Sequence, residues 1–191
     1  MPSFSGVLLR TFVCISIPKP QLKVLSGWLS ARRRDSHEFR WASPETMHIT
    51  IKFCGERPPE TVDLFLENLK NIRNRGPFEI NIKGIGGFPD LIRPKVLWAG
   101  VSGDTEALSD IRNEVEKAAH RAFIPGENKK YTPHITLGRR NSDRALTQEA
   151  LLPMQRTQPF TEPWTVTEII LMRSELSLTG PRYTPLGLFK I

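Results

Sequence analysis

Several features that mark common classes of protein are scarce in this chain. Its two cysteines, Cys14 and Cys54, form neither a C-x-x-C motif nor a cluster with histidine, so neither a disulfide scaffold nor a zinc finger is indicated. No apolar run approaches the roughly 18 residues of a membrane-spanning helix. The short run Val7–Leu9 is interrupted by Arg10, and no small-residue cleavage site follows it, so no signal peptide is predicted. We therefore expect a cytoplasmic protein without a membrane segment.

Acidic residues are outnumbered by basic ones. Lys and Arg number 27 against 20 Asp and Glu, which gives a net charge of +7 and a pI of about 9.7. Such an excess concentrates polyanions near the surface, so nucleic acid is a candidate partner. Apolar residues (39%) and charged residues (25%) are at globular levels. We expect a single domain over residues 1–191, in which residues 1–8 form an N-terminal extension without regular structure.

The spacing of apolar residues predicts a mixture of strands and helices. Strands are predicted at residues 9–17, 39–41, 47–53, 78–85, 96–101, 134–137, 164–173 and 183–190. Helices are predicted at residues 21–34, at residues 60–75 and after an N-cap at Asp104, whereas residues 143–156 are a helix or a loop. Gly180-Pro181 is predicted as the turn between the last two strands. Because strands and helices do not alternate strictly, we expect an α+β fold with largely antiparallel pairing.

One tetrapeptide occurs twice. His48–Ile51 reads His-Ile-Thr-Ile and His134–Leu137 reads His-Ile-Thr-Leu, at a separation of 134 − 48 = 86 residues. In a strand, His and Thr at positions i and i+2 share one face, while the two aliphatic residues point to the other face and anchor it. Each copy therefore presents an imidazole beside a hydroxyl. The other two histidines, His37 and His120, are expected on the surface.

Two histidines could also hold a metal ion. A metal site needs a third ligand, however, and threonine is a poor ligand for zinc, so the motif indicates a site without metal or cofactor. An imidazole exists in either protonation state at neutral pH, so a pair can supply one acid and one base for displacement at phosphorus. Hydroxyl groups can stabilise the non-bridging phosphate oxygens. We predict His48 and His134 as an acid–base pair and Thr50 and Thr136 as phosphate ligands.

Taken together, these features resemble the two-histidine phosphoesterases, and within them the RNA 2′,3′-cyclic phosphodiesterases, also called 2′-5′ RNA ligases. The resemblance covers nearly the whole chain. Besides the two tetrapeptides it includes Leu9–Val13, Arg40-Trp41, Pro44-Glu45, Phe53, Gly55-Glu56, Gly84–Pro89, Pro94–Trp98, Tyr131–Pro133 and Arg182–Thr184. It implies a bilobal α+β fold in which two largely antiparallel sheets surround a central cleft, with helices outside and a pseudo-twofold axis between the halves.

The resemblance also implies roles for individual residues. His48 would protonate the leaving 3′ oxygen and His134 would activate water, which leaves a 2′-phosphate. Phe53 and Arg139 would flank the terminal base, since an aromatic ring and a guanidinium can stack on any base. We expect a regular strand that places Phe53 on the same face as His48 and Thr50.

Lys130 and Tyr131 lie just before the second histidine and are candidates for contact with RNA phosphates. Three functions stay open: hydrolysis of RNA 2′,3′-cyclic phosphate ends, reversible 2′-5′ joining of tRNA halves, and non-catalytic binding of RNA ends. Small nucleotides are also possible substrates. Intact His and Thr at all four positions argue against the binding module, because binding alone does not require two titrating groups. We expect a monomer whose partner is RNA, with tRNA fragments among the candidate substrates.

Overall fold

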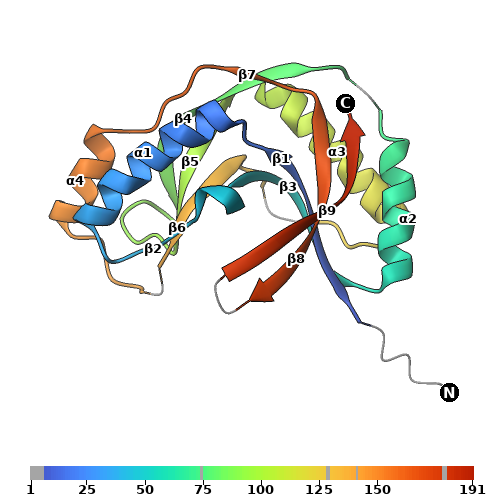
Figure 1. Cartoon of the computed structure of the whole chain (residues 1–191), viewed down its shortest axis with the longest axis horizontal. Helices are drawn as coiled ribbons and strands as arrows, with labels where there is room; N and C mark the ends of the chain where they lie inside the picture. The colour runs from blue at the N-terminus through green and yellow to red at the C-terminus, as the bar shows by residue number, and fades with distance from the viewer. Residues whose placement is uncertain (1–6, 74, 128–129, 141, 178–179) are drawn as a thin grey trace.

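The computed structural model describes residues 7–73, 75–127, 130–140, 142–177 and 180–191 (Figure 1). Of the expected N-terminal extension, residues 1–6 lie outside the described residues, and the last two, Val7 and Leu8, are exposed and precede the first strand. The described chain combines a nine-stranded antiparallel sheet with four α-helices, which confirms the α+β class. Among the described residues, no helix is both long enough and apolar enough to span a bilayer.

The sheet is built from two halves of four strands. The first half runs in the order β7 (Trp164–Val166), β4 (Phe78–Phe88), β5 (Val96–Gly103) and β6 (His134–Arg139). The second half runs in the order β3 (His48–Arg57), β1 (Leu9–Ser16), β8 (Glu168–Ser177) and β9 (Gly180–Lys190). A short strand, β2 (Arg40–Trp41), also pairs with β6. The two expected sheets are thus joined into one, through a pair between β3 and β6 that is formed at Ile49 and Ile135.

The helices cover the outer side of the sheet in two pairs. They are α1 (Lys19–Asp35), α2 (Pro59–Lys70), α3 (Thr105–Arg121) and α4 (Gln148–Arg156), with a short 3-10 helix η1 (Pro44–Thr46) before β3. Figure 1 shows α1 and α4 over the first half and α2 and α3 over the second half. Helix α1 nevertheless follows β1 of the second half, and α3 follows β5 of the first half. Each half is therefore covered in part by a helix that follows a strand of the other half.

Several predicted elements differ from the structure. The helix predicted at 60–75 ends at Lys70. The segment predicted as one strand, 164–173, forms two strands, because β7 pairs with β4 whereas β8 pairs with β1 and β9. Gly180-Pro181 forms the first two residues of β9, where Gly180 pairs with Ser177, and does not form the turn. The ambiguous segment 143–156 contains helix α4. The predicted cap at Asp104 is confirmed, since its carboxylate accepts the backbone N–H of Ala107 at 2.9 Å.

Both copies of the repeated tetrapeptide end in a β-bulge at the fourth residue. In β3, Thr50 and Lys52 pair with successive residues of β1, so Ile51 has no partner there. In β6, Thr136 and Gly138 pair with successive residues of β5, so Leu137 has none. A bulge adds one residue to a strand and thereby reverses the alternation of side chains beyond it. The two strands are therefore distorted at equivalent places.

The bulge in β3 turns a lysine into the core. Lys52 is 0% exposed, and its ammonium lies 2.8 Å from a carboxylate oxygen of Glu116 and donates to the Pro125 carbonyl at 2.9 Å. A buried charge is tolerated when it is paired and hydrogen-bonded. The pair connects β3 to α3, so it ties a helix of the second half to the strand that carries His48.

We expect Glu116→Gln to lower the free energy of unfolding by about 3–5 kcal/mol, because it leaves the Lys52 ammonium buried without its counter-ion. The double variant Lys52→Met, Glu116→Gln should recover the part of that loss that comes from the buried ammonium, while Arg112 still lacks the Glu116 carboxylate that lies 3.5 Å away in the wild type. Urea denaturation of the two variants and the wild type measures both effects. A double variant as unstable as the single one would contradict the ion-pair account.

Candidate active site

The two His-x-Thr units lie side by side at the centre of the sheet. Because Ile49 and Ile135 are antiparallel partners, His48 and Thr136 adjoin one end of this pair and Thr50 and His134 adjoin the other. Both isoleucines are fully buried, whereas the four polar residues are half-buried. The histidines and threonines therefore share one face of the sheet, the open face, which is the face opposite the core.

Each imidazole is fixed by the same backbone hydrogen bond. Nδ1 of His48 lies 2.8 Å from the Thr46 carbonyl oxygen, and Nδ1 of His134 lies 2.7 Å from the Thr132 carbonyl oxygen. A carbonyl oxygen can only accept, so Nδ1 carries the hydrogen in both rings. The lone pair of the neutral ring is then on Nε2. Each histidine can thus accept a proton at Nε2, or donate one from it when charged.

Two aromatic rings hold His48 on the open face. Phe12 is stacked on the imidazole, with ring centroids 4.6 Å apart and an interplanar angle of 28°. Tyr183 meets the same imidazole edge-on, at 5.4 Å and 87°. Phe12 and Tyr183 also contact each other at 4.9 Å. Strands β1, β3 and β9 therefore fix the orientation of this ring together.

A second aromatic pair borders His134. Phe88 meets the imidazole edge-on at 5.0 Å, and the ring of Trp98 lies 6.1 Å away. Trp98 lies directly over Gly86, where a Cβ atom would approach its ring to 2.1 Å. Glycine at this position is therefore needed for the indole to reach the histidine. The two histidines have similar surroundings, although different residues supply them.

The surroundings lower the pKa of both histidines. Burial is the largest cause in each case, because it penalises the charged ring, and the carbonyl contacts at Thr46 and Thr132 oppose it. The positive charge of Arg139 lowers the pKa of both rings further, and His134 adds to the effect on His48. In the free protein both imidazoles are therefore mostly neutral at neutral pH. An anion bound between them would favour the charged form.

Phe53 and Arg139 occupy equivalent positions beyond the bulges, since 53 − 48 = 5 and 139 − 134 = 5. Phe53 is 50% exposed and lies 6.0 Å from the ring of Phe12, and Arg139 is exposed. We predicted that a regular strand would place Phe53 on the face of His48, and this reason is wrong. An odd spacing puts two residues of a regular strand on opposite faces. The bulge at Ile51 reverses the alternation and brings Phe53 to the open face.

Tyr131 and Lys130 lie in the segment before β6. The Tyr131 hydroxyl donates to the Thr50 carbonyl at 3.1 Å, and the guanidinium of Arg112 lies 5.0 Å from the centre of its ring. This half-buried tyrosine thus links the segment before His134 to the strand of Thr50. Lys130 is exposed. Contact of either residue with RNA stays a prediction.

Four aromatic residues around the histidines were not predicted from the sequence to belong to the site. A signal was present, because Phe12, Phe88, Trp98 and Tyr183 all lie in segments that carry the family resemblance. His37 and His120 are exposed, as expected. Within the described part of the chain, no group of three or more His, Cys, Asp or Glu side chains is placed to hold a metal ion.

Comparisons with known proteins agree on one family. The model of the 2′-5′ RNA ligase superfamily matches residues 21–177. An RNA 2′,3′-cyclic phosphodiesterase of Aquifex aeolicus is 37% identical over 147 residues, which are 76% of this chain and 78% of that protein. One of Aeropyrum pernix is 35% identical over 163 residues, 82% of this chain and 91% of that protein. A crystal structure of a protein from Thermus thermophilus matches with a TM-score of 0.74 and 29% identity, covering 95% of this chain and 97% of that one.

We expect both central histidines of the free protein to titrate below 6.5, the ordinary histidine pKa, because burial disfavours the imidazolium ion. NMR titration of the imidazole C–H signals measures the two midpoints, and His37→Gln and His120→Gln variants assign the remaining signals. Inorganic phosphate should raise both midpoints, since an anion stabilises the charged rings. A midpoint above 6.5 for either ring in the free protein would contradict this description.

Proposed function

Because the chain belongs to the 2′-5′ RNA ligase superfamily, we propose that it hydrolyses RNA 2′,3′-cyclic phosphate ends to 2′-phosphomonoesters. The relatives named RNA 2′,3′-cyclic phosphodiesterase support this reaction. The observation that carries the proposal is the pairing of two His-x-Thr units on one open face. Each unit offers an imidazole with a free Nε2 and a hydroxyl beside it.

The reaction needs one base and one acid on opposite sides of the phosphorus atom. Nε2 of His134 takes a proton from water as the water oxygen attacks phosphorus. The bond from phosphorus to the 3′ oxygen breaks, and this oxygen receives the proton from Nε2 of His48. The product carries a 2′-phosphate and a 3′-hydroxyl, and solvent restores the starting protonation states. Each proton transfer contributes about 10²- to 10⁴-fold in rate.

The substrate itself helps to supply the acid. Both histidines have lowered pKa values in the free protein, so a neutral His48 must gain a proton before or during binding. The negative charge of the phosphodiester favours that protonation. The hydroxyls of Thr50 and Thr136 would donate to the non-bridging oxygens, where negative charge is concentrated. None of these steps uses a metal ion.

The terminal base is proposed to lie between Phe53 and Arg139. Both residues stand on the open face at equivalent places beyond the two bulges. A ring and a guanidinium that face a base from two sides recognise its π-surface and tolerate any base identity.

We expect His48→Ala and His134→Ala each to lower turnover by about 10²- to 10⁴-fold, because each removes one of the two proton transfers. The assay follows release of the 2′-phosphate from an oligoribonucleotide with a cyclic phosphate end, in excess EDTA. His120→Ala, a histidine variant on the exposed surface of α3, is the matched control and should keep full activity.

Full activity in either central variant would refute the acid–base assignment. Binding of the cyclic-phosphate RNA by the wild type without product would favour a non-catalytic module instead. Formation of a longer product from 5′-hydroxyl and cyclic-phosphate RNA halves would show that the same groups also run the joining reaction in reverse.

A further inference from the structure

Two arginines stand directly opposite each other beside the histidine pair. Arg40 of β2 is the antiparallel partner of Arg139 of β6, and both side chains are exposed. Directly paired residues of antiparallel strands point to the same face, with Cβ atoms about 4.5–5.5 Å apart. Arg40 therefore accompanies Arg139, whose charge acts on both histidines.

The neighbouring pair fixes the direction in which these arginines point. Trp41 is opposite Gly138, and a Cβ atom at Gly138 would lie 3.2 Å from the Trp41 ring. Trp41 packs on the core: its ring lies 5.0 Å from Phe39, and its indole N–H donates to the Ser36 carbonyl at 3.2 Å. Trp41 and Gly138 thus face inward. By alternation, Arg40 and Arg139 face the open side.

Three carboxylates in the adjoining segments are engaged with other partners, and one of them, Glu45, accepts a hydrogen bond from the Ser43 hydroxyl. Glu38 pairs with the buried Arg140, and Asp143 pairs with Lys95 at 2.9 Å. Among the side chains that the structure describes, neither Arg40 nor Arg139 takes part in an ion pair. Like charges directly opposite each other in a sheet are destabilising. An anion at the arginine pair would remove this repulsion.

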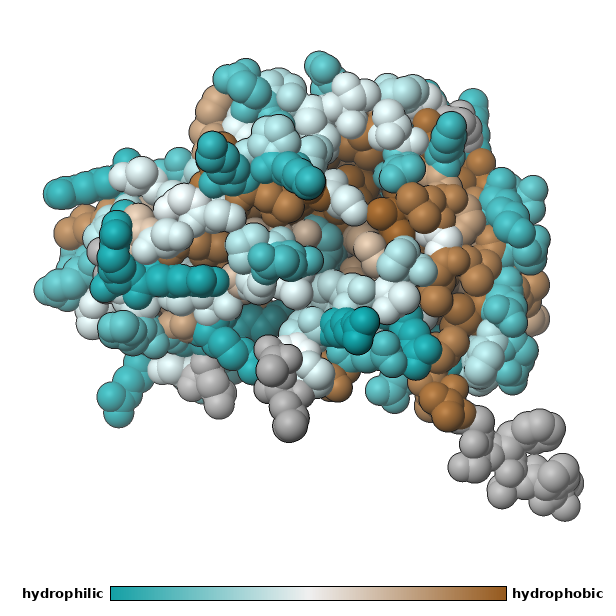
Figure 2. Space-filling view, viewed as in Figure 1, coloured by the Kyte–Doolittle hydropathy of each residue, from teal (hydrophilic) through white to brown (hydrophobic). Residues whose placement is uncertain are grey.

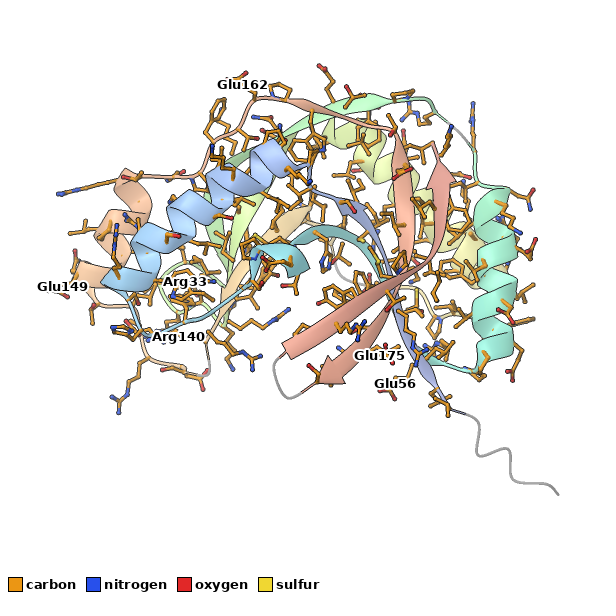
Figure 3. The ribbon with its side chains drawn as sticks, viewed as in Figure 1. Arg33, Glu56, Arg140, Glu149, Glu162 and Glu175 are labelled. Carbon is orange, nitrogen blue, oxygen red and sulfur yellow. The ribbon has the colours of Figure 1, made fainter. Side chains whose placement is uncertain are left out.

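Strand β2 extends the positive charge away from the histidines along the first half. It pairs with β6 at Gly138 and Arg139, beyond the point at Ile135 where β3 pairs with the same strand. Figure 2 shows hydrophilic side chains gathered over this half, and Figure 3 shows Arg33 there, whereas the charge of Arg140 is buried and met by Glu38. In the second half the position equivalent to Arg139 holds the apolar Phe53. The exposed Arg10 of β1, whose charge acts on Tyr183, is opposite the acidic Glu56 and not opposite a second arginine. An RNA backbone that leaves the site is therefore favoured along the first half.

We infer that Arg40 binds the phosphate group on the 5′ side of the terminal nucleotide, so that the preferred substrates are RNA chains and not free mononucleotides. This inference rests on the proposed function. With the cyclic phosphate at the histidines and the base against Arg139, the 5′ phosphate is the next anion along the chain. A guanidinium binds a phosphate through two parallel hydrogen bonds, which suits this role.

The test compares two substrates that differ in the upstream phosphate. One is adenosine 2′,3′-cyclic phosphate with a 5′-hydroxyl, and the other is a dinucleotide that ends in the same cyclic nucleotide. We expect Arg40→Gln to lower kcat/KM on the dinucleotide about ten-fold or more, mainly through KM, and on the mononucleotide by less than about two-fold. The slope of the logarithm of the dinucleotide binding constant against the logarithm of salt concentration should become shallower, by about the amount that one phosphate contact contributes.

Arg156→Gln is the matched control, because it removes the same charge from an exposed position on α4 and should leave both substrates unaffected. Arg40→Lys should recover part of the loss on the dinucleotide, since it restores the charge without the two-pronged geometry. Unchanged thermal denaturation midpoints verify that each variant is folded.

An equal loss on both substrates, or no loss on the dinucleotide, would overturn the role given to Arg40. Failure of the wild type to turn over either substrate would sink the proposed function separately. The role of Arg40 is then decided by the affinities of the wild type and of Arg40→Gln for the two compounds, measured by calorimetry. If Arg40→Gln binds the dinucleotide more weakly than the wild type does but binds the mononucleotide equally well, the role of Arg40 is supported. If the two proteins bind the dinucleotide with equal affinity, that role is overturned.

Discussion

The backbone pair between Ile49 and Ile135 is the contact on which the site depends. It joins the two halves of the sheet and sets the register of β3 against β6. Side chains alternate along a strand, so a slip of one residue would turn a histidine and its threonine into the core and expose the aliphatic residues. The buried isoleucines resist such a slip. The polar residues of the open face are thus held in place by apolar packing on the opposite face.

The two bulges make strands β3 and β6 alike beyond the threonines, and they are also the point at which the two halves begin to differ. Each bulge lets a strand supply three side chains to the open face: the histidine, the threonine and the residue five positions after the histidine. The residue just before that last one turns inward, and here the halves differ. In β3 it is Lys52, whose charge is met by Glu116, and in β6 it is Gly138, which accommodates Trp41. The glycine leaves space for Trp41 of β2, the strand that also carries Arg40.

The sequence was sufficient to predict the class of fold and the central residues, because these depend on local patterns. Apolar spacing located most helices and strands, and the repeated tetrapeptide located the histidines and threonines. Local patterns do not determine which strands become neighbours. The bulges arise from the register of β3 against β1 and of β6 against β5, and the division of residues 164–173 arises from different partners for β7 and β8. The pairing of Arg40 with Arg139 joins positions 139 − 40 = 99 residues apart, which no local pattern indicates.

The exchange of helices between the halves has a consequence for the autonomy of each half. Helix α1 covers the half to which β1 does not belong, and α3 does the same in the opposite direction (Figure 1). A single cut anywhere between α1 and β6 therefore yields no fragment that holds all strands and helices of one half. The two halves are similar in space, but each is built from segments that alternate along the chain with those of the other half. Neither half is therefore expected to fold as an independent domain.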